Sequence, residues 1–330
     1  MGAGKVILLD ILMIAAILLT FAYFHHVRPA MQARAAVQNT PVQPTAAPTP
    51  EVTPQPVIDT RTEWQKKFAD HFTDEIVQTD HSYSSPEVSV DIQKYVIGEG
   101  SSQVTYFVAD IYIARVENFA TYMANNRYEY YGTQDAVDMD IDSGAVVSIN
   151  GDFINYQQSG FMMRNGEMIL DQQTGKDICV LYRDGTMETY AGGKYDKQAV
   201  MDRDPYHIWN FGPLLLTEEG EVGSVKNISE TVTYINPRSA VGYYEPGHYC
   251  FVIVEGRQDE YSAGMRLGEL GQLFKDLGCK AAYNLDGGGS AMMTFNDDVY
   301  THPSNGGKRK LGDLLLIREY TPAGEQEAIQ

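Results

Sequence analysis

Residues 267–290 read LGELGQLFKDLGCKAAYNLDGGGS, and this stretch joins an amphipathic helix to an apolar strand and a glycine-rich turn. Leucines and Phe274 recur at helical spacing as far as Leu277, and Gly278 can adopt the left-handed backbone that commonly ends a helix. The apolar run 281–285 that follows is typical of a buried strand. The sequence therefore predicts a domain that closes with a helix followed by a strand.

Upstream of this stretch, apolar residues alternate with polar ones in the manner of strands. Val88, Val90 and Ile92 show this period of two, and a longer strand-like run follows at residues 105–116. Further strands are expected at 145–149, 161–163, 178–182, 186–190, 214–217, 231–235, 249–254, 280–285, 291–295 and 314–317. Because these strands are interleaved with few helices, the pattern predicts a single α+β domain at residues 86–320, built around one mixed, strand-rich sheet.

The residues before this domain divide into three parts. Residues 6–24 are apolar apart from Asp10 and are long enough to cross a bilayer as a helix, so residues 1–30 are expected to form a transmembrane signal-anchor. Residues 31–60 are rich in Pro, Thr and Ala and are expected to form an extended linker. Residues 61–85 are expected to hold a lead-in with an amphipathic helix at 62–76, which carries Trp64, Phe68 and Phe72 on one face.

This organisation predicts a single-pass protein of the cell membrane, with the folded domain outside the cytoplasm and a C-terminal tail at residues 321–330. The membrane is thus one expected partner, reached through the N-terminal helix. Cleavage after residues 33–35, Ala-Arg-Ala, would instead make the apolar segment a signal peptide and the protein secreted.

Charge and cysteine content limit the classes of function. A formal net charge of -19 and a pI near 4.7 repel nucleic acid, so no nucleic-acid partner is expected, and an anionic substrate would need a local cluster of arginines. Cys179, Cys250 and Cys279 each lie beside an apolar run and are expected to be buried thiols. No Cys-x-x-Cys spacing occurs, which excludes the usual redox and structural zinc motifs.

The segment 284–290 contains three consecutive glycines between Asp286 and Ser290, directly after an expected strand. Such a run costs conformational entropy, and its use would be the close approach of backbone N–H groups to an anion such as phosphate. Asp286 could hold a sugar hydroxyl, activate water or bind a cation, and Ser290 could donate a hydrogen bond to a phosphate oxygen. A bulged hairpin is the alternative interpretation.

Similar polar segments follow other expected strands. Asp152 comes after residues 145–149, although the Asn-Gly before it also suits a simple hairpin turn. Arg238, which follows a proline, is a side chain suited to bidentate recognition of phosphate, although it could also be a surface arginine paired with a carboxylate. Glu255 and Arg257 follow residues 249–254, and Arg309 lies in a basic loop at 302–310. Strand ends of this kind could converge on one rim of the domain.

Together these segments resemble the phosphodiester glycosidase family, in the family's order and over about residues 88–318. The resemblance rests on Ile149-Asn150-Gly151-Asp152-Phe153, Phe211-Gly212-Pro213-Leu214-Leu215, Pro237-Arg238-Ser239-Ala240-Val241-Gly242, Glu255-Gly256-Arg257, Gly264-Met265 and Asn284-Leu285-Asp286-Gly287-Gly288-Gly289-Ser290. It implies a hydrolase that splits a sugar from phosphate, with bacterial members tied to teichoic-acid-like or exopolysaccharide polymers. Two departures occur: the family's common Arg-Thr-Ala is Arg238-Ser239-Ala240 here, and Asp152 stands where some members carry glycine.

From the motifs and this resemblance we predict the site residues. Catalytic roles are expected for Asp286, Arg238, Asp152 and Glu255, and substrate-binding roles for Asn150, Gly151, Asn284, Gly287, Gly288, Gly289, Ser290, Ser239, Arg257 and Arg309. The expected reaction passes through an oxocarbenium-like state, in which an arginine and the glycine amides neutralise the departing phosphate while a carboxylate steadies the sugar cation or activates water. The expected partner is a glycan or glycopolymer that contains a sugar phosphate in the cell envelope.

Two other functions remain open at this point. One is a metal-assisted phosphodiesterase that breaks the P–O bond, with a divalent cation held by Asp152, Asp286 and Glu255. The glycosidase itself is expected to require no cofactor, although a divalent cation at Asp152 and Asp286 is possible. The other is a non-catalytic glycan-binding or polymer-assembly factor. His207, His248 and His302 lie in no nucleophilic arrangement and are expected to be structural or surface residues.

Overall fold

The computed structural model describes residues 59–225 and 228–320. The chain divides into two units, Met1–Asp59 and Thr60–Gln330, and nearly all of the described residues belong to the second. The expected anchor at residues 1–30, all but the end of the linker at 31–60, and the tail at 321–330 lie outside the described residues. Among the residues that are described, no helix is both long enough and apolar enough to cross a membrane.

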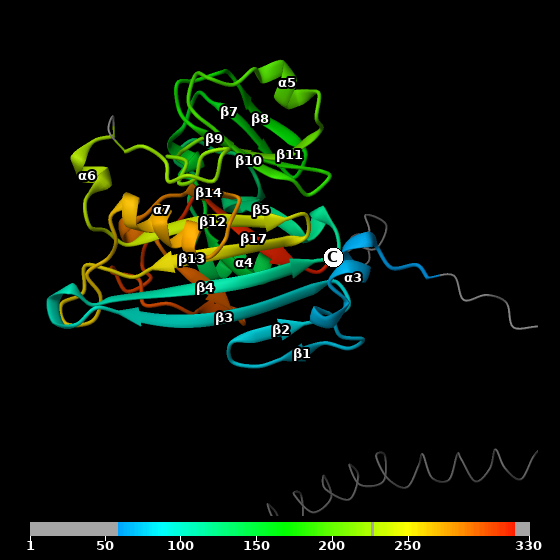
Figure 1. Cartoon of the computed structure of the whole chain (residues 1–330), viewed down its shortest axis with the longest axis horizontal. Coiled ribbons are helices and arrows are strands. Elements are labelled where there is room, and N and C mark those ends of the chain that lie inside the picture. The colour runs from blue at the N-terminus through cyan, green and yellow to red at the C-terminus, as the bar shows by residue number, and fades with distance from the viewer. Residues whose placement is uncertain (1–58, 226–227, 321–330) are drawn as a thin grey trace, which may run out of the picture. The chain divides into compact units, whose positions relative to one another are not determined.

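Three antiparallel sheets form the second unit (Figure 1). The largest has seven strands in the order β1 (Val77–Gln78), β2 (Ser82–Ser84), β3 (Val88–Ile97), β4 (Val104–Ile113), β13 (His248–Val254), β12 (Arg238–Glu245) and β14 (Ala281–Asn284). A second sheet has the order β16 (Asp298–Val299), β15 (Met293–Phe295), β6 (Ala145–Asn150), β17 (Asp313–Arg318) and β5 (Phe119–Met123). The third has the order β10 (Met187–Tyr190), β9 (Ile178–Tyr182), β11 (Pro205–Trp209), β7 (Phe161–Arg164) and β8 (Glu167–Asp171).

The prediction of a single strand-rich domain with few helices is confirmed, but the prediction of one mixed sheet was wrong. Every strand pair within the described residues is antiparallel, including those of β12 with both β13 and β14. The helix α7 (Leu267–Asp276) does join two strands that run in the same direction, β13 and β14. However, β12 lies between them and pairs with each, so this helical crossover creates no parallel pair.

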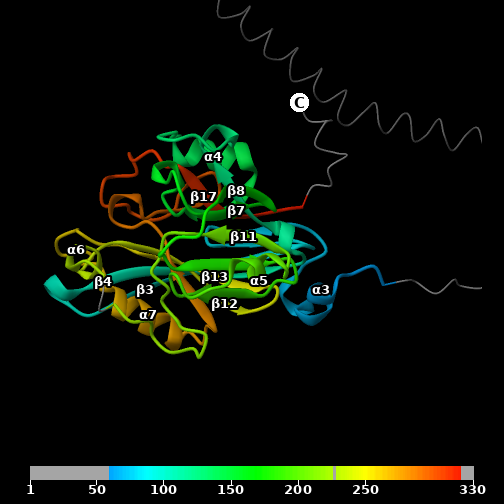
Figure 2. The same cartoon turned by 90° about the horizontal axis from the view of Figure 1, so that it is seen from above.

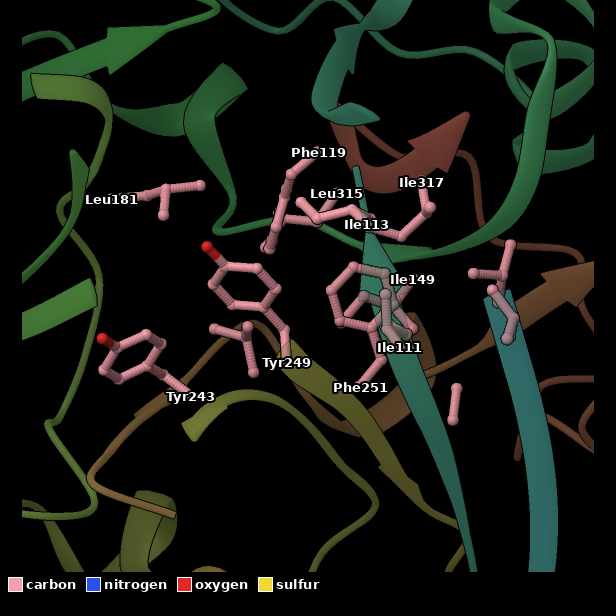
Figure 3. Close-up of a cluster of buried hydrophobic side chains, with 14 of the residues drawn as sticks. Ile111, Ile113, Phe119, Ile149, Leu181, Tyr243, Tyr249, Phe251, Leu315 and Ile317 are labelled. Atoms are coloured by element: carbon pink, nitrogen blue, oxygen red, sulfur yellow. The ribbon is translucent and has the colours of Figure 1, made fainter. Parts of the chain in front are cut away.

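The central core lies where the sheets face one another. Ile111 and Phe251 of the seven-stranded sheet pack with Ile149 and Leu315 of the second sheet, and Leu181 of the third sheet belongs to the same cluster (Figure 3). All of these side chains are buried. This core holds the ends of β6, β14 and β17 in fixed positions, and the polar residues described below lie at those ends.

The helices cover the outer faces of the sheets. Leu270 and Phe274 of α7 pack on Cys250 and Val252 of the seven-stranded sheet, while Met139 of α4 (Ala136–Ser143) packs on the second sheet. In Figure 2, α7 and α4 lie on opposite sides of the seven-stranded sheet. The third sheet packs its outer face on α5 (Lys197–Met201).

Several sequence predictions are confirmed locally. The helix expected at 267–277 is α7, and Gly278, which follows the C-cap residue Leu277, has a positive φ of 84°. All three cysteines are free and buried. Most expected strands are present within one or two residues of their predicted bounds.

Three predicted elements were wrong. The helix expected at 62–76 is α3 (Glu63–Lys67) followed by a 3₁₀ turn, Ala69–His71, because Phe68 leaves the helix and packs on Tyr112 with ring centroids 5.1 Å apart. The strand expected at 231–235 is the helix α6 (Glu230–Thr233), and carbonyls of this segment accept hydrogen bonds from the Arg238 side chain instead of from a neighbouring strand. The strand expected at 214–217 makes only isolated bridges.

Candidate active site

Two adjoining cavities lie where β14 ends and the triglycine begins. The larger, of about 210 Å³, is lined by Arg238, Arg257, Arg309 and the segment 284–289. The smaller, of about 30 Å³, is lined by the end of β6, by Ser290 and by the start of β17. Asp286 and Arg309 line both cavities, so the two meet at these side chains.

Hydrogen bonds between strand ends bring this site together. The Asn150 side-chain amide at the end of β6 donates to the carbonyl of Asp286 at 2.6 Å, and the backbone N–H of Asp286 donates to the carbonyl of Gly151 at 3.2 Å. The Asn150 side-chain oxygen accepts a bond from the Met292 N–H. The second sheet and the seven-stranded sheet are thereby tied together at the point where Asp286 lies.

Among the three arginines of the larger cavity, Arg238 has hydrogen bonds to three carbonyls of the protein. Its Nε donates to the carbonyl of Met265 at 3.0 Å, and its Nη2 donates to the carbonyls of Val232 and Tyr234. Burial, together with the nearby charge of Arg257, lowers the pKa of Arg238 to about 10. The guanidinium is therefore still charged at neutral pH, and its orientation is fixed by the protein before a ligand enters.

Arg257 and Arg309 are exposed and line the same cavity as Arg238. We call these three side chains the arginine wall. Arg257 donates to the side-chain oxygen of Asn236 at 2.7 Å. Within the described residues, none of the three arginines forms a salt bridge with a carboxylate. In a chain with a net charge of -19, three guanidinium groups without such a partner on one cavity indicate a binding site for an anion.

The triglycine, residues 287–289, contributes to the arginine wall in a different way from the one that the sequence predicted. Two of the expected donors are already engaged, since the Gly287 N–H bonds to Asp286 Oδ1 and the Gly288 N–H bonds to the Pro237 carbonyl. A Cβ atom on Gly287 would lie 2.7 Å from the Pro237 oxygen, and one on Gly288 would lie 3.0 Å from the Arg257 guanidinium. The glycines thus allow Arg257 to approach the loop closely, rather than forming a complete nest of amide donors.

The loop that carries Arg309 is held at two points. The side-chain amide of Asn305 donates to the Gly289 carbonyl at 2.8 Å. The backbone N–H of His302 donates to Oε1 of Glu255, a buried carboxylate at the end of β13. Arg309 therefore reaches the cavities from a loop whose position depends on these two contacts.

Two carboxyl groups line the smaller cavity, and the sequence motifs indicated only one of them. Burial raises the pKa of Asp286, whereas Ser290, Arg309 and the Gly287 N–H oppose that shift. Asp313 at the start of β17 is fully buried, and desolvation together with the charge of Asp152 raises its pKa to about 8, against the opposing charge of Arg164. Burial and the charge of Asp152 thus favour the protonated form of Asp313.

The structure brings together most of the predicted site residues. Those that line one or both cavities are Asp286, Arg238, Asn150, Gly151, Asn284, Gly287, Gly288, Gly289, Ser290, Arg257 and Arg309. Asp152, Glu255 and Ser239 are buried and line neither cavity. Oδ1 of Asp152 lies 2.7 Å from Arg164 Nη2, and its other oxygen accepts a bond from the Asn210 N–H.

The residues predicted for a possible divalent cation do not form a metal site. No group of three or more His, Cys, Asp or Glu side chains arranged to hold a metal is present in the part of the chain that the structure describes. Asp152 is held by Arg164 and Glu255 by His302, so neither carboxylate is arranged around a common point with Asp286.

Comparisons with known proteins identify a family for the chain. The family model described as Phosphodiester glycosidase matches residues 143–318, which is more than half of the chain. The SPbeta prophage-derived uncharacterized protein YomE of Bacillus subtilis (strain 168) is 27% identical over 197 residues. The match covers 57% of this chain but only 30% of that relative, so the chain spans less than a third of its length.

The fold is shared with a solved structure. The catalytic domain of zebrafish N-acetylglucosamine-1-phosphodiester alpha-N-acetylglucosaminidase, auto-inhibited by its pro-peptide, has a TM-score of 0.56 and 21% identity, covering 74% of this chain and 88% of that one. A hypothetical protein from Synechocystis has a TM-score of 0.48 and 14% identity, covering 71% and 63%. On the family match, the chain belongs to the phosphodiester glycosidase family, whose members are hydrolases that act on phosphodiester glycosidic bonds.

Proposed function

We propose that this protein hydrolyses the bond between the anomeric carbon of a sugar and the phosphate of a sugar 1-phosphodiester. The observation that carries the proposal is the junction of the two cavities at Asp286 and Arg309. One cavity has the charge to hold a phosphodiester, and the other has the carboxyl groups that glycoside hydrolysis uses. A substrate that spans the junction would place its glycosidic bond beside Asp286.

On this proposal, the arginine wall stabilises the departing phosphate. A phosphate monoester is a weak base, so its departure needs stabilisation of negative charge more than it needs a proton. Arg257 and Arg309 are exposed to the ligand, while Arg238 adds a positive charge whose position is fixed by three carbonyls. Because these groups are held in place before the reaction, little reorganisation opposes the separation of charge.

The two carboxyl groups would act on the sugar. In the ionised form, Asp286 would stabilise the oxocarbenium-like sugar or activate the attacking water. Protonated Asp313 would donate a hydrogen bond to a sugar hydroxyl in the smaller cavity. The pKa of both groups is raised by burial, but Ser290, Arg309 and the Gly287 N–H oppose the shift at Asp286, whereas the charge of Asp152 adds to it at Asp313. This difference assigns the role of proton donor to Asp313 and that of base to Asp286.

The first substrate to test is a phosphodiester of N-acetylglucosamine 1-phosphate, since the zebrafish structure of similar fold bears that substrate in its name. The p-nitrophenyl ester should yield the free sugar and p-nitrophenyl phosphate. Hydrolysis in ¹⁸O-labelled water then distinguishes the two bonds. The phosphate product is the one to analyse, because the anomeric oxygen of a free sugar exchanges with water.

Unlabelled p-nitrophenyl phosphate would support cleavage of the C–O bond. Label in that phosphate would mean cleavage of the P–O bond, and the protein would then be a phosphodiesterase. Saturable binding of the ester without any product would favour a glycan-binding factor. The matched control is Asp286→Asn, which retains the size of the side chain and is expected to lose turnover by a factor of at least about 10².

The natural substrate and location follow as part of the same proposal. We place the substrate in an exopolysaccharide or teichoic-acid-like polymer of the cell envelope, and the catalytic domain outside the cytoplasm, anchored by residues 1–30. The apolar run at residues 6–24 is the support for this location. Whole cells treated with external protease should lose the domain, and alkaline carbonate should leave the full chain in the membrane fraction. Protection of the domain in intact cells would reject the location.

A further inference from the structure

Three exposed tyrosines lie together beside the smaller cavity. Tyr131 is 60% exposed, Tyr156 is 45% exposed and Tyr130 is 38% exposed. Most exposed apolar side chains of a soluble domain are scattered singly, so a cluster of large rings at a cavity edge needs a reason. We call Tyr130, Tyr131 and Tyr156 the tyrosine cluster.

The tyrosine cluster is continuous with the lining of the cavity. The ring of Tyr156 stacks on that of Phe153 with centroids 4.2 Å apart, and both side chains line the cavity that contains Asp286 and Asp313. The ring of Tyr131 meets Tyr156 edge to face at 5.1 Å, and Tyr130 lies 4.0 Å from Tyr131. A row of aromatic rings therefore runs from the cavity outward to solvent.

The backbone holds part of this row in an unfavourable conformation. Tyr131 and Phe153 both have positive φ angles, 63° and 64°, which bulky side chains rarely adopt. The Tyr131 N–H donates to the Asn155 carbonyl at 2.7 Å, which fixes the first loop on the second. Strained residues that persist in this way cluster at binding sites, where the surrounding structure determines their position.

The row extends from the smaller cavity, which Asp286, Asp313 and Arg309 line, whereas Arg238 and Arg257 line only the larger one. A group bound on the tyrosine cluster would therefore join the substrate on its sugar side and not beyond the phosphate. A pyranose ring has an apolar C–H face and a rim of hydroxyl groups, and tyrosine matches both with its ring and its hydroxyl. The hydroxyl of Tyr130 already donates to that of Tyr131 at 3.0 Å, so polar atoms lie at the edge of the cluster.

We infer that the tyrosine cluster is a subsite for a second sugar ring, so that the preferred substrate is an oligosaccharide or polysaccharide end that carries the anomeric phosphodiester. This inference rests on the proposed function for the placement of the first sugar. It specifies oligosaccharide or polysaccharide substrates, because the 1-phosphodiester of a monosaccharide would not reach the tyrosine cluster.

The test compares two p-nitrophenyl phosphodiesters, one of N-acetylglucosamine 1-phosphate and one of the corresponding β-1,4-linked disaccharide. The wild-type protein should show a kcat/KM for the disaccharide ester about three- to tenfold above that for the monosaccharide ester. Tyr131→Ala should lose this preference while the monosaccharide value stays unchanged, and Tyr131→Phe, which keeps the ring, should retain most of it. Tyr95→Ala is the matched control, because Tyr95 is an exposed tyrosine that lines neither cavity.

Equal kcat/KM values for the two esters in the wild type, or an equal loss on both in Tyr131→Ala, would overturn the subsite. If neither ester is hydrolysed, the proposed function has failed. The subsite is then tested by the binding of oligosaccharides without catalysis. Titration with chitotriose and cellotriose, followed by tyrosine fluorescence, should show binding that Tyr156→Ala weakens. No binding of either trisaccharide to the wild-type protein would overturn the inference independently of catalysis.

Discussion

Arg164 Nη2 lies 2.7 Å from Oδ1 of Asp152, and neither side chain is exposed to solvent. The same guanidinium also donates to the carbonyls of Met163 and Ile208, and it lies 3.6 Å from Asp313 Oδ2. This buried pair therefore lies directly against one of the two carboxyl groups of the candidate site. It sets both the stability of that region and the charge that Asp313 experiences.

Replacing one member of the pair leaves the other as an uncompensated buried charge. Arg164→Met should lower the free energy of unfolding by about 3 to 5 kcal/mol, measured by urea denaturation. The control is Arg203→Met, because Arg203 and its partner Glu188 are partly exposed, and such a change typically costs less than about 1 kcal/mol. Similar losses in the two variants would contradict the role assigned to burial.

Asp313 should make stability depend on pH. Its folded-state pKa of about 8 is above its ordinary value of 3.8, so the folded protein holds a proton that the unfolded chain releases. The contribution of this group is complete below about pH 4 and is lost as the pH rises toward 8. In the wild type, the free energy of unfolding should therefore fall over this pH range by at least ~1.4 kcal/mol, the value of one pKa unit. This fall should be absent from Asp313→Asn.

The same proton bears on catalysis. If protonated Asp313 donates to the sugar, the kcat/KM of the wild type should decline above about pH 8, and this alkaline decline should be absent from the residual activity of Asp313→Asn. The unfolding and rate measurements are made on the same preparations. A difference in unfolding free energy between wild type and variant that does not change with pH would contradict the assignment.

Arg257 should matter for the phosphodiester and not for the fold. It is exposed and its guanidinium donates only to Asn236 among the described residues, so Arg257→Met should leave the urea midpoint nearly unchanged. Loss of a charged donor to the departing phosphate should lower kcat by about 10²-fold. Arg127→Met removes another exposed arginine, distant in the sequence and outside both cavities, and should retain full activity. Unchanged turnover in Arg257→Met would remove Arg257 from the anion site.

Alanine should have opposite effects at two glycines, Gly287 of the triglycine and Gly268 of α7. Gly287→Ala brings a Cβ atom to 2.7 Å from the Pro237 oxygen and should destabilise the protein by about 1 to 3 kcal/mol, with loss of activity as the loop shifts. Gly268→Ala, on the first turn of α7, meets nothing within 4 Å and should stabilise by up to about 1 kcal/mol. Tolerance of Gly287→Ala at full activity would show that close packing of this loop is unnecessary.

Local patterns predicted the elements whose causes are local. The helical spacing of Leu270 and Phe274 and the stop at Gly278 are sufficient to define α7, and the apolar runs define most strands. Pairing directions were not predictable in the same way. The position of β12 between β13 and β14 depends on contacts between distant segments, which a single sequence does not specify.

The same limit applies to the site. Arg238 and Asp286 belong to motifs and were identified, whereas Asp313 begins an apolar strand and has no motif around it. It reaches the cavity because β17 pairs with β6, with Leu314 opposite Asn150. Asp152 illustrates the converse case. Its motif suggested a site residue, but only the fold reveals that Arg164, twelve positions later, takes up its carboxylate.

The bond from His302 to Glu255 has a consequence for mutational scanning. Glu255 lines neither cavity, yet it fixes one end of the loop from which Arg309 extends. A shortened or apolar side chain at that position would remove the acceptor, free the loop and displace a guanidinium several residues away. A screen that ranks positions by lost turnover would then place Glu255 beside residues that contact the substrate. Its effect would come from the displaced Arg309 loop, because Glu255 itself does not contact the reacting bond.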